Sequence, residues 1–162
     1  MGAYGAALVL TMKGDTEGAL ALLTKMDSPY KPIFIGEFFV NGNRFKEAVD
    51  VLSAETNPIA RYYLARAYEG QGNLPMAART YQEILPYAGT FPEAYQRVGM
   101  TFGRQGEEGA GYEYLGRYYL AMGRDGPARI NLEKAVSKYG INSPESEEIL
   151  KLLDTVKGQK KR

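Results

Sequence analysis

Residues 62–81 read YYLARAYEGQGNLPMAARTY and predict one helix, a tight turn and a second, antiparallel helix. Gly72-Asn73 marks the turn, because a helix often ends at a residue that adopts the left-handed conformation. Ala65 lies in the first helix and Ala77 in the second, and both are small enough to let two helix backbones approach closely. We therefore expect a helical hairpin that packs through small residues.

The same hairpin pattern recurs along the chain, which indicates an internal repeat. The turn positions are Gly14, Asn43, Gly72, Gly106 and Gly123. Seven residues before each turn stands a very small residue: Ala7, Gly36, Ala65, Gly99 and Gly116. Five residues after each turn stands another: Ala19, Ala48, Ala77, Gly111 and Ala128. Large residues stand four before and nine after each turn: Leu10 and Leu23, Phe39 and Leu52, Tyr68 and Tyr81, Phe102 and Leu115, Tyr119 and Leu132.

This spacing resembles the tetratricopeptide repeat (TPR), in which L-G-x-x-Y precedes a turn glycine and A-x-x-x-F follows it. The segment from Leu115 to Ala135 is the copy nearest to that pattern. The first-helix Trp of the family is absent, and the turns are 29, 29, 34 and 17 residues apart, where the family period is about 34. Because the last spacing is half a period, we expect the helix at about residues 107–122 to be second helix of one repeat and first helix of the next.

The resemblance implies an all-α fold, a right-handed superhelical solenoid of stacked antiparallel helix pairs with about ten helices. We expect TPR-like repeats over residues 1–142, a capping helix over 143–157 and a frayed basic tail over 158–162. The capping helix is indicated by an apolar stripe on an otherwise charged segment, made of Ile149, Leu150, Leu153 and Val156.

The first predicted helix, residues 2–13 (GAYGAALVLTMK), is apolar on nearly every side. A terminal repeat of a free-standing solenoid needs a polar outer face, and this helix lacks one. Two explanations stay open. Either another domain precedes this helix in the full-length protein, which we favour, or its exposed face meets another chain.

The composition excludes several kinds of chemistry. The chain has no histidine and no cysteine, which excludes Ser-His-Asp and Cys-His catalysis, His-ligated zinc and disulfides. Its acids lie mostly on predicted helix surfaces, with no pair suited to general acid/base work. The net charge of +1 argues against a nucleic-acid partner, and no apolar run approaches the ~18 residues of a membrane span. We expect no catalytic residue, no metal and no cofactor.

Residues 99–111, GMTFGRQGEEGAG, carry five glycines. A phosphate-binding loop is disfavoured, because neither G-x-x-x-x-G-K-[ST] nor G-x-G-x-x-G after a strand is present. Gly99, Gly106 and Gly111 fall on repeat positions, whereas Gly103 and Gly109 have no place in the repeat. We expect those two glycines to weaken or kink their helices, since glycine in a helix interior costs about 1 kcal/mol relative to alanine.

In stacked helical hairpins the first helices line a concave surface, and their side chains not used in packing point into the groove. Aromatic, methionine and arginine side chains there suit an extended or helical peptide. The candidate partner-binding residues are Ile33, Glu37, Tyr62, Arg66, Glu69, Gln96, Met100, Arg104, Glu113 and Arg117. The double role of the helix at 107–122 could turn Glu113 and Arg117 away from the groove.

A narrower resemblance covers residues 91–136. They are similar to the TPR region that follows the catalytic domain of bacterial HExxH zinc metalloproteases of the β-barrel assembly-enhancing group. In that group R-x-G-M-x-[YF]-G-x-x-G leads into Y-x-L-G-x-Y-Y. The matching residues here are Arg97, Gly99, Met100, Phe102, Gly103, Gly106, Tyr112, Leu115, Gly116, Tyr118 and Tyr119.

This resemblance implies a non-catalytic accessory domain in the periplasm. Such a domain would dock onto the outer-membrane protein assembly machinery or its substrates, with an N-terminal catalytic domain of the same chain packed on residues 2–13. The alternative is a stand-alone TPR adaptor, cytoplasmic or secretory, that binds a peptide or helix of a different client. An enzyme acting alone is disfavoured because histidine and cysteine are missing.

Overall fold

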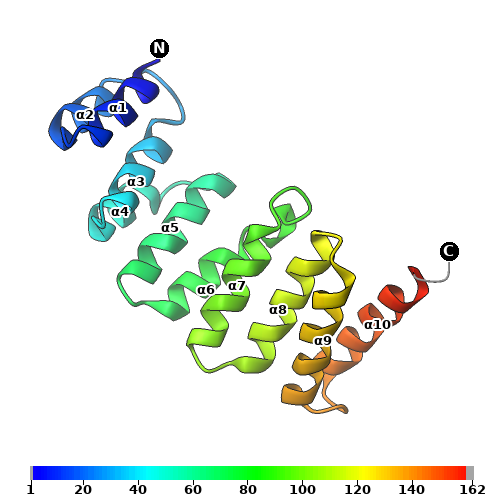
Figure 1. The fold of residues 1–162 in the computed structure, drawn as a ribbon. Helices are drawn as coiled ribbons and strands as arrows, with labels where there is room; N and C mark the ends of the chain where they lie inside the picture. Colours follow the sequence, from blue (N-terminus) through cyan, green and yellow to red (C-terminus); the bar gives the residue numbers. More distant parts are fainter. Residues whose placement is uncertain (1, 160–162) are drawn as a thin grey trace. The chain divides into compact units, whose positions relative to one another are not determined.

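A computed structural model describes residues 2–159 of the 162-residue chain, and these residues form an all-α fold of ten α-helices (Figure 1). The helices are α1 (Ala3–Met12), α2 (Thr16–Thr24), α3 (Lys31–Asn41), α4 (Phe45–Leu52), α5 (Pro58–Gly70), α6 (Leu74–Gln82), α7 (Glu93–Arg104), α8 (Glu108–Ala121), α9 (Asp125–Tyr139) and α10 (Pro144–Gln159). A short 3-10 helix, η1 (Leu85–Tyr87), lies between α6 and α7. The predicted all-α class and the number of helices are confirmed.

The chain divides into two compact units, Met1–Asn73 and Leu74–Arg162. The first unit holds α1 to α5 and the second holds α6 to α10. The boundary falls in the turn at Gly72-Asn73, so α5 and α6 belong to different units. The capping helix expected at 143–157 corresponds to α10, which extends to Gln159. The rest of the expected tail, 160–162, lies outside the described residues.

All five predicted turn residues adopt the left-handed conformation. Their φ angles are +83° at Gly14, +58° at Asn43, +75° at Gly72, +83° at Gly106 and +66° at Gly123. After each turn residue, the next backbone N–H donates a hydrogen bond of 2.8–3.0 Å to the carbonyl five positions earlier, on the large residue of the repeat. This is the hydrogen bond of the Schellman motif, which satisfies a carbonyl at the helix end.

Two of the small residues before the turns, Gly36 and Gly116, contact a leucine of the second helix of the same hairpin. A Cβ atom placed on Gly36 of α3 would lie 2.5 Å from Cγ of Leu52 in α4. A Cβ on Gly116 of α8 would lie 2.6 Å from Cγ of Leu132 in α9. Both leucines are fully buried, so these glycines are the positions at which the paired helices pack closely.

Helices α7 and α8 approach each other most closely along their glycines. A Cβ on Gly99 would lie 2.9 Å from the carbonyl oxygen of Gly111, and a Cβ on Gly111 would lie 3.2 Å from the backbone nitrogen of Gly103. Gly109 makes room for the ring of Tyr139, because its Cβ would lie 2.8 Å from that ring. Gly109 therefore has a packing role, whereas a Cβ on Gly103 would meet no atom within 4 Å. Both α7 and α8 are unbroken helices.

Helix α8 forms hairpins with both of its neighbours in the sequence. Gly111 faces α7 across the turn at Gly106, and Gly116 faces α9 across the turn at Gly123. The predicted double role of this helix is confirmed.

Helix α1 exposes apolar side chains, as its sequence predicts. Ala7 is buried with Ala19 and Leu23 of α2, whereas the side chain of Met12 is 88% exposed. Leu8 and Val9 are exposed too, and Ala3–Met12 contains no charged residue. Whether a preceding domain or another chain covers this face stays a prediction. Within residues 2–159, none of the helices combines the length and the apolar character needed to cross a membrane.

Candidate functional site

One carboxylate joins three helices of the first unit. Glu37 of α3 accepts a hydrogen bond of 2.8 Å from the hydroxyl of Tyr4 in α1 and one of 2.5 Å from the hydroxyl of Tyr63 in α5. All three side chains are half-buried. Because α1, α3 and α5 are the first helices of their hairpins, this cluster lies along the helices that we expect to bind a partner.

The two tyrosines of this cluster are held in the neutral, donating form. Burial, together with the hydrogen bond to the negatively charged Glu37, raises the pKa of Tyr4 to about 12. The same causes raise the pKa of Tyr63 well above its usual range. Both hydroxyls therefore stay protonated at neutral pH, and Glu37 is bound by two neutral donors.

Arginine and tyrosine side chains continue the cluster along α5. The guanidinium of Arg66 lies 6.0 Å from the ring centroid of Tyr62 and 5.7 Å from that of Tyr63. The two rings meet edge to face, with centroids 5.5 Å apart. We call Tyr4, Glu37, Tyr62, Tyr63 and Arg66 the tyrosine–glutamate surface.

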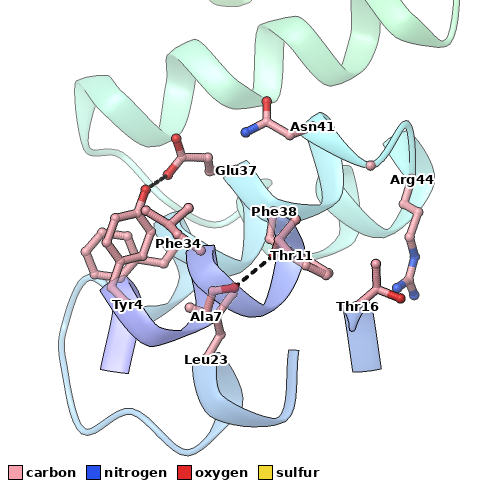
Figure 2. Close-up of a pocket in the computed structure, with 12 residues that line it drawn as sticks. Tyr4, Ala7, Thr11, Thr16, Leu23, Phe34, Glu37, Phe38, Asn41 and Arg44 are labelled. Carbon is pink, nitrogen blue, oxygen red and sulfur yellow. Dashed lines mark hydrogen bonds between the residues drawn. The ribbon is translucent and has the colours of Figure 1, made fainter. Parts of the chain in front are cut away.

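A cavity of about 200 Å³ opens beside this surface, between α1, α2 and α3 (Figure 2). The rings of Tyr4 and Phe34 stack at one end, with centroids 4.3 Å apart, and Thr16 and Arg44 lie towards the other end. Leu8, Leu23 and Phe38 are among the apolar side chains that line it, together with Ala7.

The structure places the predicted groove residues in different surroundings. Ile33 is 6% exposed and lies in the core with Leu52 and Leu64, so its side chain does not reach the surface. An alternation of exposed and buried positions cannot be read from the run IFIGEFFV, because nearly every residue in it is apolar. The predicted residues of the first unit that are partly exposed are Glu37, Tyr62, Arg66 and Glu69.

In the second unit, Gln96 is half-buried, Met100 is 47% exposed and Arg104 is exposed, all on α7. Glu113 and Arg117 of α8 instead take part in packing between helices. Arg117 lies 2.9 Å from a carboxylate oxygen of Glu113 and 2.9 Å from one of Glu148 in α10.

Glu113 also accepts a hydrogen bond of 3.0 Å from the hydroxyl of Tyr139 in α9. Both carboxylate oxygens of Glu113 are therefore engaged within the second unit. Glu113 and Arg117 therefore link α8 to α9 and α10 through a hydrogen bond and an ion pair. The sequence had suggested that the shared role of α8 could turn these two side chains away from the groove.

Tyr4 and Tyr63, the two partners of Glu37, were not predicted as site residues from the sequence, and of the residues that line the cavity only Glu37 was. One available signal was Glu37 itself, the only charged residue within IFIGEFFV, because a charge in an apolar helix calls for polar partners. The sequence does not say which hydroxyls supply them. Within residues 2–159, no group of three or more acidic side chains is arranged to hold a metal ion.

The fold of the chain resembles solved TPR structures. No protein-family model and no curated protein matches the chain. The APC/C hetero-tetramer Cut9-Hcn1 gives a TM-score of 0.57 at 14% identity, covering 93% of this chain and 35% of that chain. TTC0263, a thermophilic TPR protein of Thermus thermophilus, gives a TM-score of 0.52 at 14% identity, covering 95% of this chain and 96% of that chain. These likenesses show that the chain has the fold of tetratricopeptide-repeat proteins.

Proposed function

We propose that this chain is a non-catalytic protein-interaction module that binds a peptide or helix of a partner protein on its first helices. The observation that carries the proposal is the tyrosine–glutamate surface, with an apolar cavity beside it. Tyrosine and arginine are enriched at protein interfaces, because they combine a large contact area with hydrogen-bonding ends.

The surface is also partly ordered before any partner binds. The hydroxyls of Tyr4 and Tyr63 are fixed on Glu37, and the guanidinium of Arg66 rests near two rings. Side chains that are already held lose less conformational freedom on binding, so more of the contact energy becomes affinity.

The test is selection of binding peptides from a random 12-residue phage library, followed by titration of a selected peptide into purified variants. We expect Arg66→Glu to weaken binding by about tenfold, because it removes an interface cation and its contact with two rings. Arg79→Glu, an equal charge change at an exposed position of α6, is the matched control and should bind as the wild type does. Equal binding by both variants would remove Arg66 from the site.

The other predicted residue suited to this test is Arg104 of α7, in the second unit. We expect Arg104→Glu to weaken capture while changing thermal stability little, because the side chain is exposed. Unaltered binding by Arg66→Glu and Arg104→Glu together would refute the proposal that the first helices bind the partner.

A narrower proposal concerns the protein to which the module belongs. We propose that it is the accessory domain of a periplasmic zinc metalloprotease that acts on outer-membrane protein assembly, supported by the motif residues between Arg97 and Tyr119. A catalytic domain would then cover the exposed apolar face of α1 around Val9 and Met12.

The reading frame upstream of residue 2 tests this narrower proposal directly, since it either encodes an H-E-x-x-H helix or does not. Without one, the chain is a stand-alone adaptor, cytoplasmic or secretory. Peptidase activity of residues 1–162 with added zinc would contradict the non-catalytic assignment itself.

A further inference from the structure

We propose that the cavity between α1, α2 and α3 is a subsite that accepts one bulky apolar side chain of the partner peptide, a Leu, Met or Phe, with a Lys or Arg beside it that reaches Glu37. This inference rests on the proposed function and deepens it, because it states the chemistry of the peptide.

The size of the cavity selects a single side chain. Its volume of about 200 Å³ is smaller than the roughly 300–1,000 Å³ of pockets that hold cofactors and drug-sized ligands. It exceeds the ~150 Å³ of an apolar cavity that takes up benzene. A leucine, methionine or phenylalanine side chain therefore fits, and a nucleotide does not.

The walls favour an apolar occupant. Leu8, Leu23, Phe34 and Phe38 present apolar surface, and the hydroxyl of Thr11 is turned back onto its own helix. That hydroxyl donates a hydrogen bond of 3.0 Å to the carbonyl of Ala7. Burying a Leu, Met or Phe side chain against such walls is worth about tenfold or more in affinity.

Within the described residues, the carboxylate of Glu37 on the rim of the cavity forms no salt bridge. Arg44 is neutralised by Glu47 at 2.9 Å and lies 4.4 Å from the ring centroid of Phe39. The carboxylate of Glu37, by contrast, has two tyrosine hydroxyls as its hydrogen-bond partners in the described part of the chain, and these carry no charge. A cationic residue next to the apolar side chain complements this rim.

The rim also offers a polar group for the peptide main chain. Asn41, at the end of α3, lines the cavity and is exposed, and between residues 2 and 159 its side chain has no hydrogen-bond partner (Figure 2). A free amide can both donate to and accept from a peptide bond. A hydrogen bond from this amide would hold the peptide main chain at the edge of the cavity.

The experiment uses a peptide selected from the random 12-residue library, titrated into two variants that carry the same substitution. Thr11→Phe fills the cavity from an exposed position of α1, and Thr24→Phe is the matched control on α2. Each threonine is exposed, and each donates a hydrogen bond of 3.0 Å to the carbonyl four residues earlier in its helix. We expect Thr11→Phe to weaken binding by about tenfold or more and Thr24→Phe to leave it unchanged.

Two further measurements address the occupant and the fold. Leu8→Phe occludes the cavity from a second exposed position and should weaken binding similarly, while far-UV circular dichroism checks that each variant is folded. In the peptide, replacing the apolar residue by Ala should weaken binding to the wild type but not to Thr11→Phe. The Glu37→Gln variant should no longer prefer a peptide with Lys next to the apolar residue over a peptide with Gln at that position.

The outcomes separate this inference from the proposed function. Suppose that peptides are selected, that Arg66→Glu weakens their binding, and that Thr11→Phe and Leu8→Phe do not. The proposal of a subsite in the cavity is then wrong, and the proposed function stands. If the library yields no binding peptide, both fail. If Thr11→Phe changes the molar mass in solution instead of peptide binding, the cavity belongs to a contact between copies of this chain, and the inference is overturned.

Discussion

A single methyl group at Gly99 is expected to separate α7 from α8. The Cβ of Gly99→Ala would lie 2.9 Å from the carbonyl oxygen of Gly111 and 3.0 Å from the backbone nitrogen of Leu115, so backbone would have to move. This outweighs the gain of about 1 kcal/mol from replacing a helical glycine. We expect a net loss of about 1–3 kcal/mol in the free energy of unfolding, measured in urea.

Gly103→Ala, one turn further along α7, is the matched control. A Cβ at Gly103 meets no atom within 4 Å, so the substitution should raise the free energy of unfolding by about 0.5–1 kcal/mol. If the two alanine variants have the same stability, close packing at Gly99 does not determine the α7–α8 contact.

The hydrogen bond between Tyr4 and Glu37 predicts a pH dependence. The unfolded tyrosine has a pKa of about 10, whereas in the folded protein burial and Glu37 raise the pKa of Tyr4 to about 12. Between these values the folded state binds more protons than the unfolded state, so stability falls as pH rises. The contribution is fully present below pH ~10 and is lost as pH passes about 12.

Thermal unfolding at a series of pH values tests this linkage. The stability difference between the wild type and Tyr4→Phe should shrink from pH ~10 towards pH ~12. Tyr30→Phe, at a residue that is 55% exposed, should show no such trend relative to the wild type. A constant difference for Tyr4→Phe across this range would contradict the assignment.

At the scale of elements, the hairpins depend on the left-handed residue of each turn. Gly123 has a φ of +66°, and a Cβ there would meet no atom within 4 Å, so only the backbone conformation opposes a side chain. Gly123→Ala should lower the free energy of unfolding by about 1 kcal/mol. Gly126→Ala, at a helical position of α9 that is equally open, should not lower it. Urea midpoints of the two variants, three residues apart, provide the comparison.

The repeat register was predictable at this scale because it is local. Left-handed turn residues, small residues before and after them and a leucine such as Leu52 or Leu132 follow from helix periodicity and from the geometry of a helix end. The spacing of 17 residues between the last two turns, half of the repeat period, likewise predicted that α8 belongs to two successive hairpins. The role of Gly109 in α8 was not predictable, since this glycine makes room for the ring of Tyr139, 30 residues later, and has no place in the repeat.

At the scale of the whole molecule, each helix contacts helices that are close to it in the sequence. In repeat proteins the stability of each element depends mainly on its contacts with neighbouring elements. The Gly99→Ala variant should therefore exchange its amide hydrogens faster in α7 and α8, with α1 to α3 nearly unchanged. Hydrogen exchange resolved by NMR measures this, with Gly103→Ala as the control. Equal acceleration in all helices would indicate that the chain unfolds as one cooperative unit.

The all-α class, the positions of the turns and the small residues at which paired helices pack could be predicted from the amino-acid sequence alone, because they depend on residues that lie close together in the chain. Only the tertiary structure showed that Ile33 is buried, that Arg117 is paired with Glu148, and that Tyr4 and Tyr63 both bind Glu37. The partners of Glu37 lie 33 and 26 residues away in the chain. Such groups meet only after several helices have packed, and local periodicity carries no information about which of many exposed tyrosines will reach a given carboxylate.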